Sequence, residues 1–182
     1  MEDGGRLALI SVVGFLLIMI AITGRLGSIL ASVVAPGDMS ETPAGSAATG
    51  LNPGATANLP KTGTLNATQI GQYAILAGFS DQNALTVAIA IALAESSGQI
   101  AVTHKNMDGS TDYGLWQINS VHSSYSPARL LTPLYNAQAA YNISGSGSNW
   151  NPWTTYTTGV YQKFLSEARN GAVAAAEANV GI

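Results

Sequence analysis

The sequence predicts an α+β domain, mostly helical with one small β-hairpin, that is preceded by a transmembrane helix and a flexible linker. Three observations predict this arrangement: an uncharged apolar run near the beginning, a following stretch rich in Gly, Pro, Ser, Thr and Ala, and a last segment with helix caps and a turn signal. We expect a membrane anchor over residues 1–35, a linker over 36–65, a single globular domain over 66–166 and an Ala-rich tail over 167–182.

The composition excludes several classes of function. Charged residues make up 9% of the 182 residues and the formal net charge is −3, so no basic surface for nucleic acid is expected. The chain has no cysteine, which removes disulfides, thiolate chemistry and cysteine-based zinc sites. Its two histidines, His104 and His122, are too few and too far apart for a histidine-rich metal site. We therefore expect no metal, no cofactor and no nucleic-acid partner.

The anchor is predicted from residues 7–23, which carry no charge and consist mostly of large apolar side chains. At about 1.5 Å per residue they span roughly 25 Å, slightly less than the ~30 Å hydrocarbon core of a bilayer. Arg25 interrupts the run and further apolar residues extend it to Ala35, so residues 7–35 are expected to contact lipid. A cleaved secretory signal is the alternative, although its apolar region is usually shorter and follows a positive segment. Arg6 and Arg25 bracket the span evenly, which leaves its orientation open.

The linker over residues 36–65 contains almost no large apolar side chains. Such a composition buries too little surface to offset the entropy cost of ordering the chain. We interpret this segment as a flexible tether between the anchor and the domain.

Two helices are predicted at the beginning of the domain. Asn66 with Gln69 forms a capping-box pattern for a first helix that reaches about Gly78. Ser80 is the expected cap of a second helix, whose alternating core TVAIAIALA also fits a buried strand. The length of the segment, its alanine content, its cap and Gly98 at its end favour a buried helix.

The second half of the domain is predicted to contain the hairpin and shorter helices. Asp108-Gly109 is a hairpin turn signal between two short polar strands. Three prolines, Pro127, Pro133 and Pro152, lie where proline is tolerated near helix starts. The Ala-rich end of the chain is expected to be a frayed helix or a tail.

Two carboxylates of this domain stand out as candidate catalytic groups. Glu95 lies near the C-terminal end of an apolar helix, where both the apolar surroundings and the helix dipole favour the protonated form that a general acid needs. An equally weighted alternative is that Glu95 simply points into water as the helix ends. Asp112 follows 17 residues later among Ser and Thr, so it could stay ionised and face Glu95 across a cleft, or only bond local backbone groups. Two carboxylates in unlike environments are typical of glycoside hydrolysis.

Glu95-Ser96 and NMDGSTDYGLWQINS at residues 106–120 resemble the active-site stretch of the chicken-type lysozymes, in the lysozyme-like superfamily. The resemblance implies a lysozyme-like fold with Glu95 as general acid and Asp112 as the nucleophilic or ion-stabilising carboxylate. The same resemblance implies that Trp150 packs beside Glu95. It also implies that five further residues bind substrate or support the two carboxylates: Asn106, Gln117, Asn119, Trp150 and Trp153.

A second resemblance connects ESSG, YGLWQIN and AAYNISGSGSNWNPWTTYTTGVYQKFL to the lysozyme-like, transglycosylase-type modules of bacteriophage virion proteins. In that group the glutamate is essential and the second carboxylate is often missing. This resemblance adds Tyr141 as a substrate-binding candidate near the acid. The chain departs from the chicken-type pattern because it has no cysteine and carries His122 and Ser123 where tryptophans usually follow the QINS segment.

The expected function is that of a peptidoglycan hydrolase (a muramidase) that cuts the β-1,4 bond between N-acetylmuramic acid and N-acetylglucosamine, serving local cell-wall penetration by a bacteriophage particle. The alternatives are a lytic transglycosylase that releases 1,6-anhydromuramic products and a catalytically silent glycan-binding or structural spike domain. We expect a single-pass protein of the virion membrane or particle, with other virion membrane or capsid proteins as partners. The outer face of a bacterial plasma membrane is the alternative location.

Overall fold

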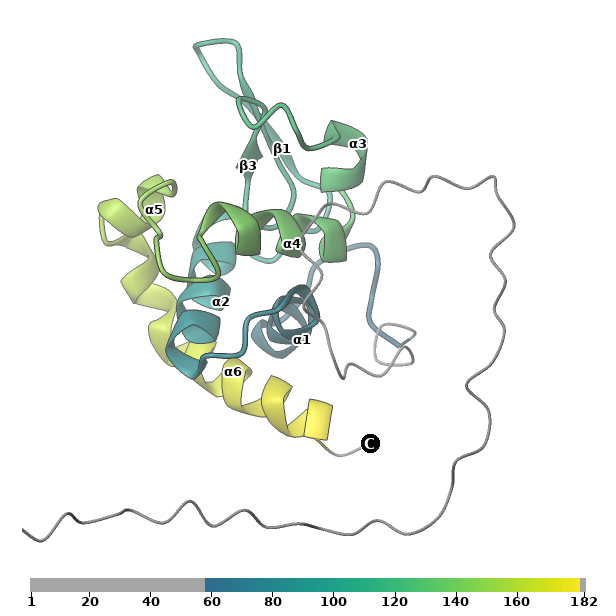
Figure 1. Ribbon diagram of the computed structural model, residues 1–182, viewed down its shortest axis with the longest axis vertical. Coiled ribbons are helices and arrows are strands. Elements are labelled where there is room, and N and C mark those ends of the chain that lie inside the picture. Colours follow the sequence, from purple (N-terminus) through teal and green to yellow (C-terminus); the bar gives the residue numbers. More distant parts are fainter. Residues whose placement is uncertain (1–57, 181–182) are drawn as a thin grey trace, which may run out of the picture. The chain divides into compact units, whose positions relative to one another are not determined.

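The computed structural model describes residues 58–180, a mostly helical domain with one small sheet (Figure 1). The expected anchor over residues 1–35 and most of the linker over 36–65 lie outside the described residues. Within the described part, no helix is both long and apolar enough to cross a bilayer. In chain order the elements are α1 (Ala67–Ala77), α2 (Gln82–Ser96), β1 (Thr103–Lys105), β2 (Thr111–Tyr113), β3 (Ile118–Asn119), α3 (Pro127–Leu130), α4 (Pro133–Ile143), α5 (Thr154–Thr157), the 3₁₀ helix η1 (Val160–Phe164) and α6 (Leu165–Val180).

The cap of α1 has the geometry that the sequence predicts. The Gln69 amide donates to Asn66 Oδ1 at 2.9 Å, and the Asn66 amide donates to Gln69 Oε1 at 3.0 Å. The cap of α2 is Asp81 rather than the expected Ser80, because the Asp81 carboxylate accepts a hydrogen bond from the Ala84 amide at 2.8 Å. A capped helix therefore begins at each predicted place, with a one-residue difference at α2.

Helix α2 is the central element of the domain, and its burial explains its ambiguous sequence. Helices α1, α6, η1 and α5 all pack against it, so its residues are buried on nearly every side. A helix enclosed in this way is apolar all round and shows no amphipathic period. The TVAIAIALA segment is helical, as its length and caps predict.

The sheet has three antiparallel strands in the order β1-β2-β3, one more strand than the predicted hairpin. The turn between β1 and β2 contains Gly109 at φ 90°, as the Asp-Gly signal predicts. In the register of the sheet, Asp112 on the middle strand pairs with His104 on β1 and with Asn119 on β3. The middle strand thus holds Asp112 between two neighbouring strands.

The C-terminal segment, expected to be a frayed helix or a tail over residues 167–182, is instead a helix packed on the domain. Residues 165–180 form one continuous helix that packs along α1 and α2 (Figure 1), and Ala168, Ala172 and Ala175 are buried. The helices approach closely because glycines face small side chains: a Cβ on Gly71 would lie 2.8 Å from the Ala175 Cβ. The boundary expected at 166 therefore falls inside a helix that belongs to the domain.

The domain also begins before residue 66, because the last residues of the expected linker are tied to the loop after α2. The Leu65 amide donates to the Gly98 carbonyl at 2.9 Å, and the Ile100 amide donates to the Gly63 carbonyl at 3.0 Å. The Tyr73 hydroxyl donates to the Pro60 carbonyl at 3.1 Å, and Leu59 is buried. The ordered domain therefore includes the end of the segment that composition alone assigns to the tether.

A chain of residues 58–166 is expected to be much less stable than one of residues 58–180. Removing α6 uncovers the faces of α1 and α2 that its alanines bury, and we expect the thermal midpoint to fall by more than about 10 °C, the equivalent of roughly 2 kcal/mol. Circular dichroism during heating measures the difference. Val173→Ser, on the exposed side of α6, is the control and should change the midpoint little. Equal midpoints for the two chains would show that α6 is dispensable.

Candidate active site

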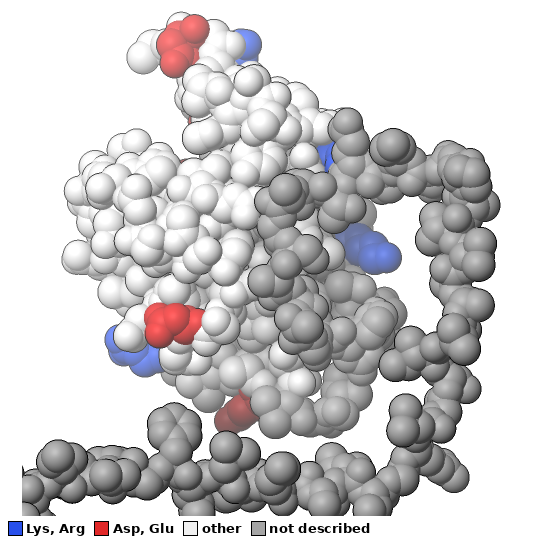
Figure 2. All heavy atoms as spheres, viewed as in Figure 1, with Lys and Arg blue, Asp and Glu red and all other residues white. Residues whose placement is uncertain are grey.

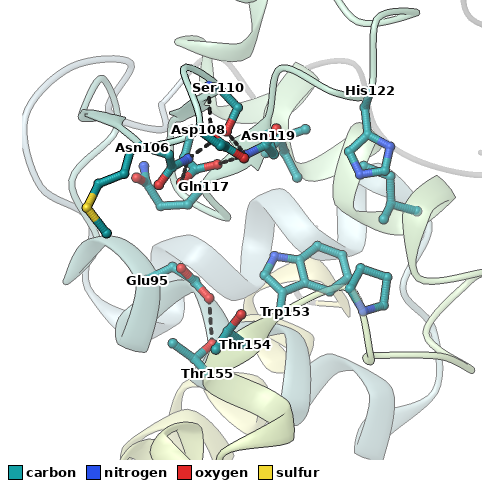
Figure 3. A pocket seen from close by; sticks show the side chains of 15 residues that line it. Glu95, Asn106, Asp108, Ser110, Gln117, Asn119, His122, Trp153, Thr154 and Thr155 are labelled. Atoms are coloured by element: carbon teal, nitrogen blue, oxygen red, sulfur yellow. Dashed lines mark hydrogen bonds between the residues drawn. The ribbon is translucent and has the colours of Figure 1, made fainter.

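A cleft of about 450 Å³ lies between the end of α2, the sheet and α5 (Figure 3). Its volume falls within the range typical of small-ligand sites, about 300–1,000 Å³. Glu95, Thr154 and Thr155 lie on one side of it, and Asn106, Ser110 and Asn119 lie on the other side (Figure 3). The cleft therefore brings together residues from both halves of the domain.

Glu95 is half-buried in the last turn of α2 and lines this cleft. Its Oε1 accepts a hydrogen bond from the Thr155 hydroxyl at 2.6 Å. Burial raises the pKa of Glu95, and the nearby charge of Asp112 raises it further, whereas the hydroxyl and the backbone N–H of Thr155 lower it. The net effect is a raised pKa, which suits a group that must donate a proton.

Asp112 is held in the cleft by two asparagine side chains. Its Oδ1 accepts from Asn119 Nδ2 at 2.7 Å and its Oδ2 accepts from Asn106 Nδ2 at 2.9 Å. Both amides also donate to the Ser110 hydroxyl oxygen, and that hydroxyl donates to Asp108 Oδ1 at 2.7 Å. Amide donors on both oxygens fix the orientation of the Asp112 carboxylate and match a group that acts as an acceptor.

Four of the predicted substrate-binding residues line the cleft together with both carboxylates, but their polar groups are engaged within the protein. Asn106 and Asn119 hold Asp112, as described above. Gln117 has φ 44°, and its side-chain amide donates to the Gly114 carbonyl at 2.7 Å. Trp153 is buried and its indole N–H donates to the Trp116 carbonyl at 2.8 Å. These four residues are Asn106, Gln117, Asn119 and Trp153.

Tyr141 and Trp150, which are also predicted to bind substrate, do not line the cleft. Trp150 is buried and stacks on Phe79 with the ring centres 5.7 Å apart, and Tyr141 meets the same ring edge-on at 5.0 Å. The tryptophan of the NWNPW segment that lines the cleft together with Glu95 is Trp153 rather than Trp150. Trp150 thus packs in the core, and its implied position beside Glu95 stays a prediction.

Several cleft residues have no role in the sequence-based site. Ser110 could have been found, because it stands two residues before Asp112 and next to the predicted Asp-Gly turn, within reach of both ends of the hairpin. His122, which stands where a tryptophan usually follows the QINS segment, also lines the cleft. Thr155 has no such signal, since it lies 60 positions from Glu95 and outside any motif. Among residues 58–180, no three His, Asp or Glu side chains converge as a metal site would require.

Part of the chain matches a known protein family. Residues 71–155 match a protein-family model described as a lysozyme-like domain, and the match includes Glu95, Asp112 and Thr155. No curated protein matches the chain. Over residues 71–155 the chain thus contains a lysozyme-like domain, mostly helical with a small three-stranded antiparallel sheet.

Glu95→Gln is expected to stabilise the fold at neutral pH. Because folding raises the pKa of Glu95, the folded state binds the Glu95 proton more tightly than the unfolded state does. The contribution of this proton to the free energy of unfolding is lost as the pH rises through the folded-state pKa. Glutamine cannot ionise, and it keeps an oxygen that can accept from Thr155. The variant should therefore melt at a higher temperature than the parent at pH 7 and 8. This difference in melting temperature should disappear below the ordinary carboxyl pKa of 4.5.

Calorimetry between pH 4 and pH 8 measures this difference, with Glu167→Gln on the exposed side of α6 as the matched control. A difference of the opposite sign, or one that does not vary with pH, would contradict the assigned environment of Glu95.

Proposed function

We propose that this domain is a muramidase that hydrolyses the β-1,4 bond between N-acetylmuramic acid and N-acetylglucosamine in bacterial peptidoglycan. The observation that carries the proposal is the pair of carboxylates in one cleft with unlike surroundings. Burial favours the protonated form of Glu95, whereas Asp112 accepts hydrogen bonds on both oxygens. The lysozyme-like match supports a glycan-cleaving activity of this general kind.

In the first step, Glu95 donates its proton to the glycosidic oxygen, and the bond from that oxygen to the anomeric carbon breaks. Asp112, held by Asn106 and Asn119, forms a bond to the anomeric carbon or stabilises its positive charge. In the second step, the Glu95 carboxylate removes a proton from water, and the oxygen of that water bonds to the anomeric carbon. Glu95 regains its proton, Asp112 is released, and the configuration of the sugar is retained.

The distribution of charge also supports a neutral sugar polymer as the substrate. Figure 2 shows that few charged side chains reach the face of the domain drawn there. Amide and hydroxyl groups surround Asp112 in the cleft, through Asn106, Ser110, Gln117 and Asn119. The side-chain N–H groups of these residues bond within the protein, and the amide oxygens of Asn106 and Gln117, for which no bond is found among residues 58–180, are the acceptors for sugar hydroxyl and N-acetyl N–H groups.

A lytic transglycosylase is the second candidate, and the hydrogen bonds of Asp112 favour it. Both carboxylate oxygens of Asp112 already accept from amides, which engages lone pairs that a nucleophile would use. A transglycosylase needs Glu95 alone, as acid and then as base, because the 6-hydroxyl of the muramic acid attacks in place of water. The products distinguish the two reactions, since the 1,6-anhydro product is lighter by one water.

Glu95→Gln is expected to lower the release of soluble fragments from isolated peptidoglycan by about 10²–10⁴-fold, the usual contribution of general acid–base catalysis. Asp112→Asn should remove most of the activity of a hydrolase and cost a transglycosylase much less. Mass spectrometry of the products should show reducing-end muramic acid. Glu167→Gln serves as the control, and thermal unfolding of each variant separates loss of activity from loss of fold.

Activity that survives in Glu95→Gln would refute both glycan-cleaving reactions. Anhydro products from the unchanged protein would replace the hydrolase with the transglycosylase. Binding of peptidoglycan without any product would instead support a silent glycan-binding or spike domain.

We also propose that residues 7–35 attach the enzyme to a membrane and that the linker lets it reach the nearby cell wall, in a bacteriophage particle or on the outer face of a bacterial plasma membrane. The support is the uncharged run at 7–23 and the composition of residues 36–65.

The full chain is expected to sediment with membranes and to be released by detergent but not by concentrated salt, because apolar contacts rather than charges would hold it. A chain of residues 58–182 should stay in the supernatant under the same conditions. Detection of the protein in purified virions would place it in the particle, and a full chain that remains in the supernatant would refute the anchor.

A further inference from the structure

Thr155 reaches from α5 across to the end of α2, and it does so with its side chain. Its hydroxyl donates to Glu95 Oε1 at 2.6 Å, and its backbone N–H also acts on the same carboxyl group. The hydroxyls of two neighbouring threonines bond instead to the backbone of α5. Those of Thr157 and Thr158 donate to the Thr154 carbonyl at 3.2 and 2.7 Å. Thr155 therefore differs from its neighbours in serving another element.

The position of Thr155 is set by Trp153, the residue before α5. The Trp153 indole N–H is bonded to the Trp116 carbonyl, and its backbone amide donates to the Trp150 carbonyl at 3.1 Å. Trp153 is buried, so this end of α5 is fixed against the domain. The hydroxyl of Thr155 is consequently presented to Glu95 by a rigid support.

The direction of this hydrogen bond distinguishes the two oxygens of Glu95. A carboxylic acid carries its proton on one oxygen, and the oxygen that accepts from the Thr155 hydroxyl is not the one that carries it. With Oε1 occupied as an acceptor, Oε2 remains as the oxygen that can hold the proton.

We propose that Thr155 is a positioning residue for the cleavage reaction: it holds Glu95 Oε1 so that Oε2 carries the transferable proton, and it stabilises the carboxylate left after transfer. This inference rests on the proposed glycan-cleaving function of Glu95. Thr155 itself need not touch the substrate, because it acts through Glu95.

The charged and titratable surroundings make Thr155 the main group that stabilises the ionised form of Glu95. Asp112 faces Glu95 and disfavours that form, as burial does, and only the two donors of Thr155 oppose them among the causes that shift its pKa. Loss of the hydroxyl should therefore raise the pKa of Glu95 further. The other titratable groups that line the cleft or lie on the elements packed against α2 are Asp108, His122, Tyr156 on α5, Tyr161 and Lys163 on η1, Glu167, Arg169 and Glu177 on α6, and Tyr73 on α1.

The test compares Thr155→Val, which keeps the shape of the side chain without its hydroxyl, with Thr155→Ser, which keeps the hydroxyl. We expect Thr155→Val to lower kcat on peptidoglycan by about tenfold or more, the rate equivalent of one hydrogen bond to a charged group. The alkaline limb of its pH–activity profile should move to higher pH, because the acid stays protonated longer. Thr155→Ser should restore both properties, and the exposed Thr157→Val should leave them unchanged.

A second measurement does not depend on activity. Titration of the Glu95 side-chain carboxyl, followed by carbon-13 NMR without substrate, should give a higher pKa in Thr155→Val than in the parent and in Thr155→Ser. Thr155→Ala replaces Thr155→Val if the latter does not fold. An unchanged profile and titration, with Glu95→Gln inactive, would overturn the role of Thr155 alone. An active Glu95→Gln would overturn the proposed function instead.

Discussion

The side-chain amide of Asn136 makes three hydrogen bonds to backbone groups at the end of β2, in the turn that follows it and at the end of α3. Its Oδ1 accepts from the Trp116 amide at 2.8 Å, and its Nδ2 donates to the Tyr113 and Leu130 carbonyls, each at 2.8 Å. Asn136 is fully buried in α4, so each of these groups would cost about 1–3 kcal/mol if it lost its partner. The same hydrogen bonds require glycine at position 114, because a Cβ there would collide with the Leu130 carbonyl and the Asn136 amide.

The turn that Asn136 fixes lies on the sheet side of the cleft and is hydrogen-bonded to elements of the opposite side. It joins β2, which carries Asp112, to β3, which carries Asn119. Within it, the Trp116 indole N–H donates to the Ala88 carbonyl of α2 at 2.9 Å, and the Trp116 carbonyl accepts from Trp153 ahead of α5. One buried amide therefore supports a series of bonds that reaches the helix of Glu95 and the helix of Thr155.

Local signals in the sequence were sufficient for the capping box of α1, for the beginning of α2 to within one residue and for the hairpin turn, since each depends on neighbouring residues. They also singled out the two carboxylates that line one cleft. Features made by distant residues were not predictable. The buried face of α6 consists of alanines such as Ala172, which lose little apolar area on burial and leave no strong pattern. In the sequence, Asn136 is one polar residue in a helix, and only the structure shows its three backbone partners. The different positions of Trp150 and Trp153 depend on the path of the loop that precedes them.

The surroundings of Glu95 also explain why a neutral hydroxyl, rather than a lysine or an arginine, faces it. In the proposed reaction Glu95 acts as an acid and then as a base, and such a group must be able to hold and release a proton near the operating pH. A cationic partner would strongly favour the carboxylate, and a wholly apolar pocket would favour the acid. The Thr155 hydroxyl can donate to Oε1 in both protonation states, so it opposes the effects of burial and of Asp112 without fixing either form.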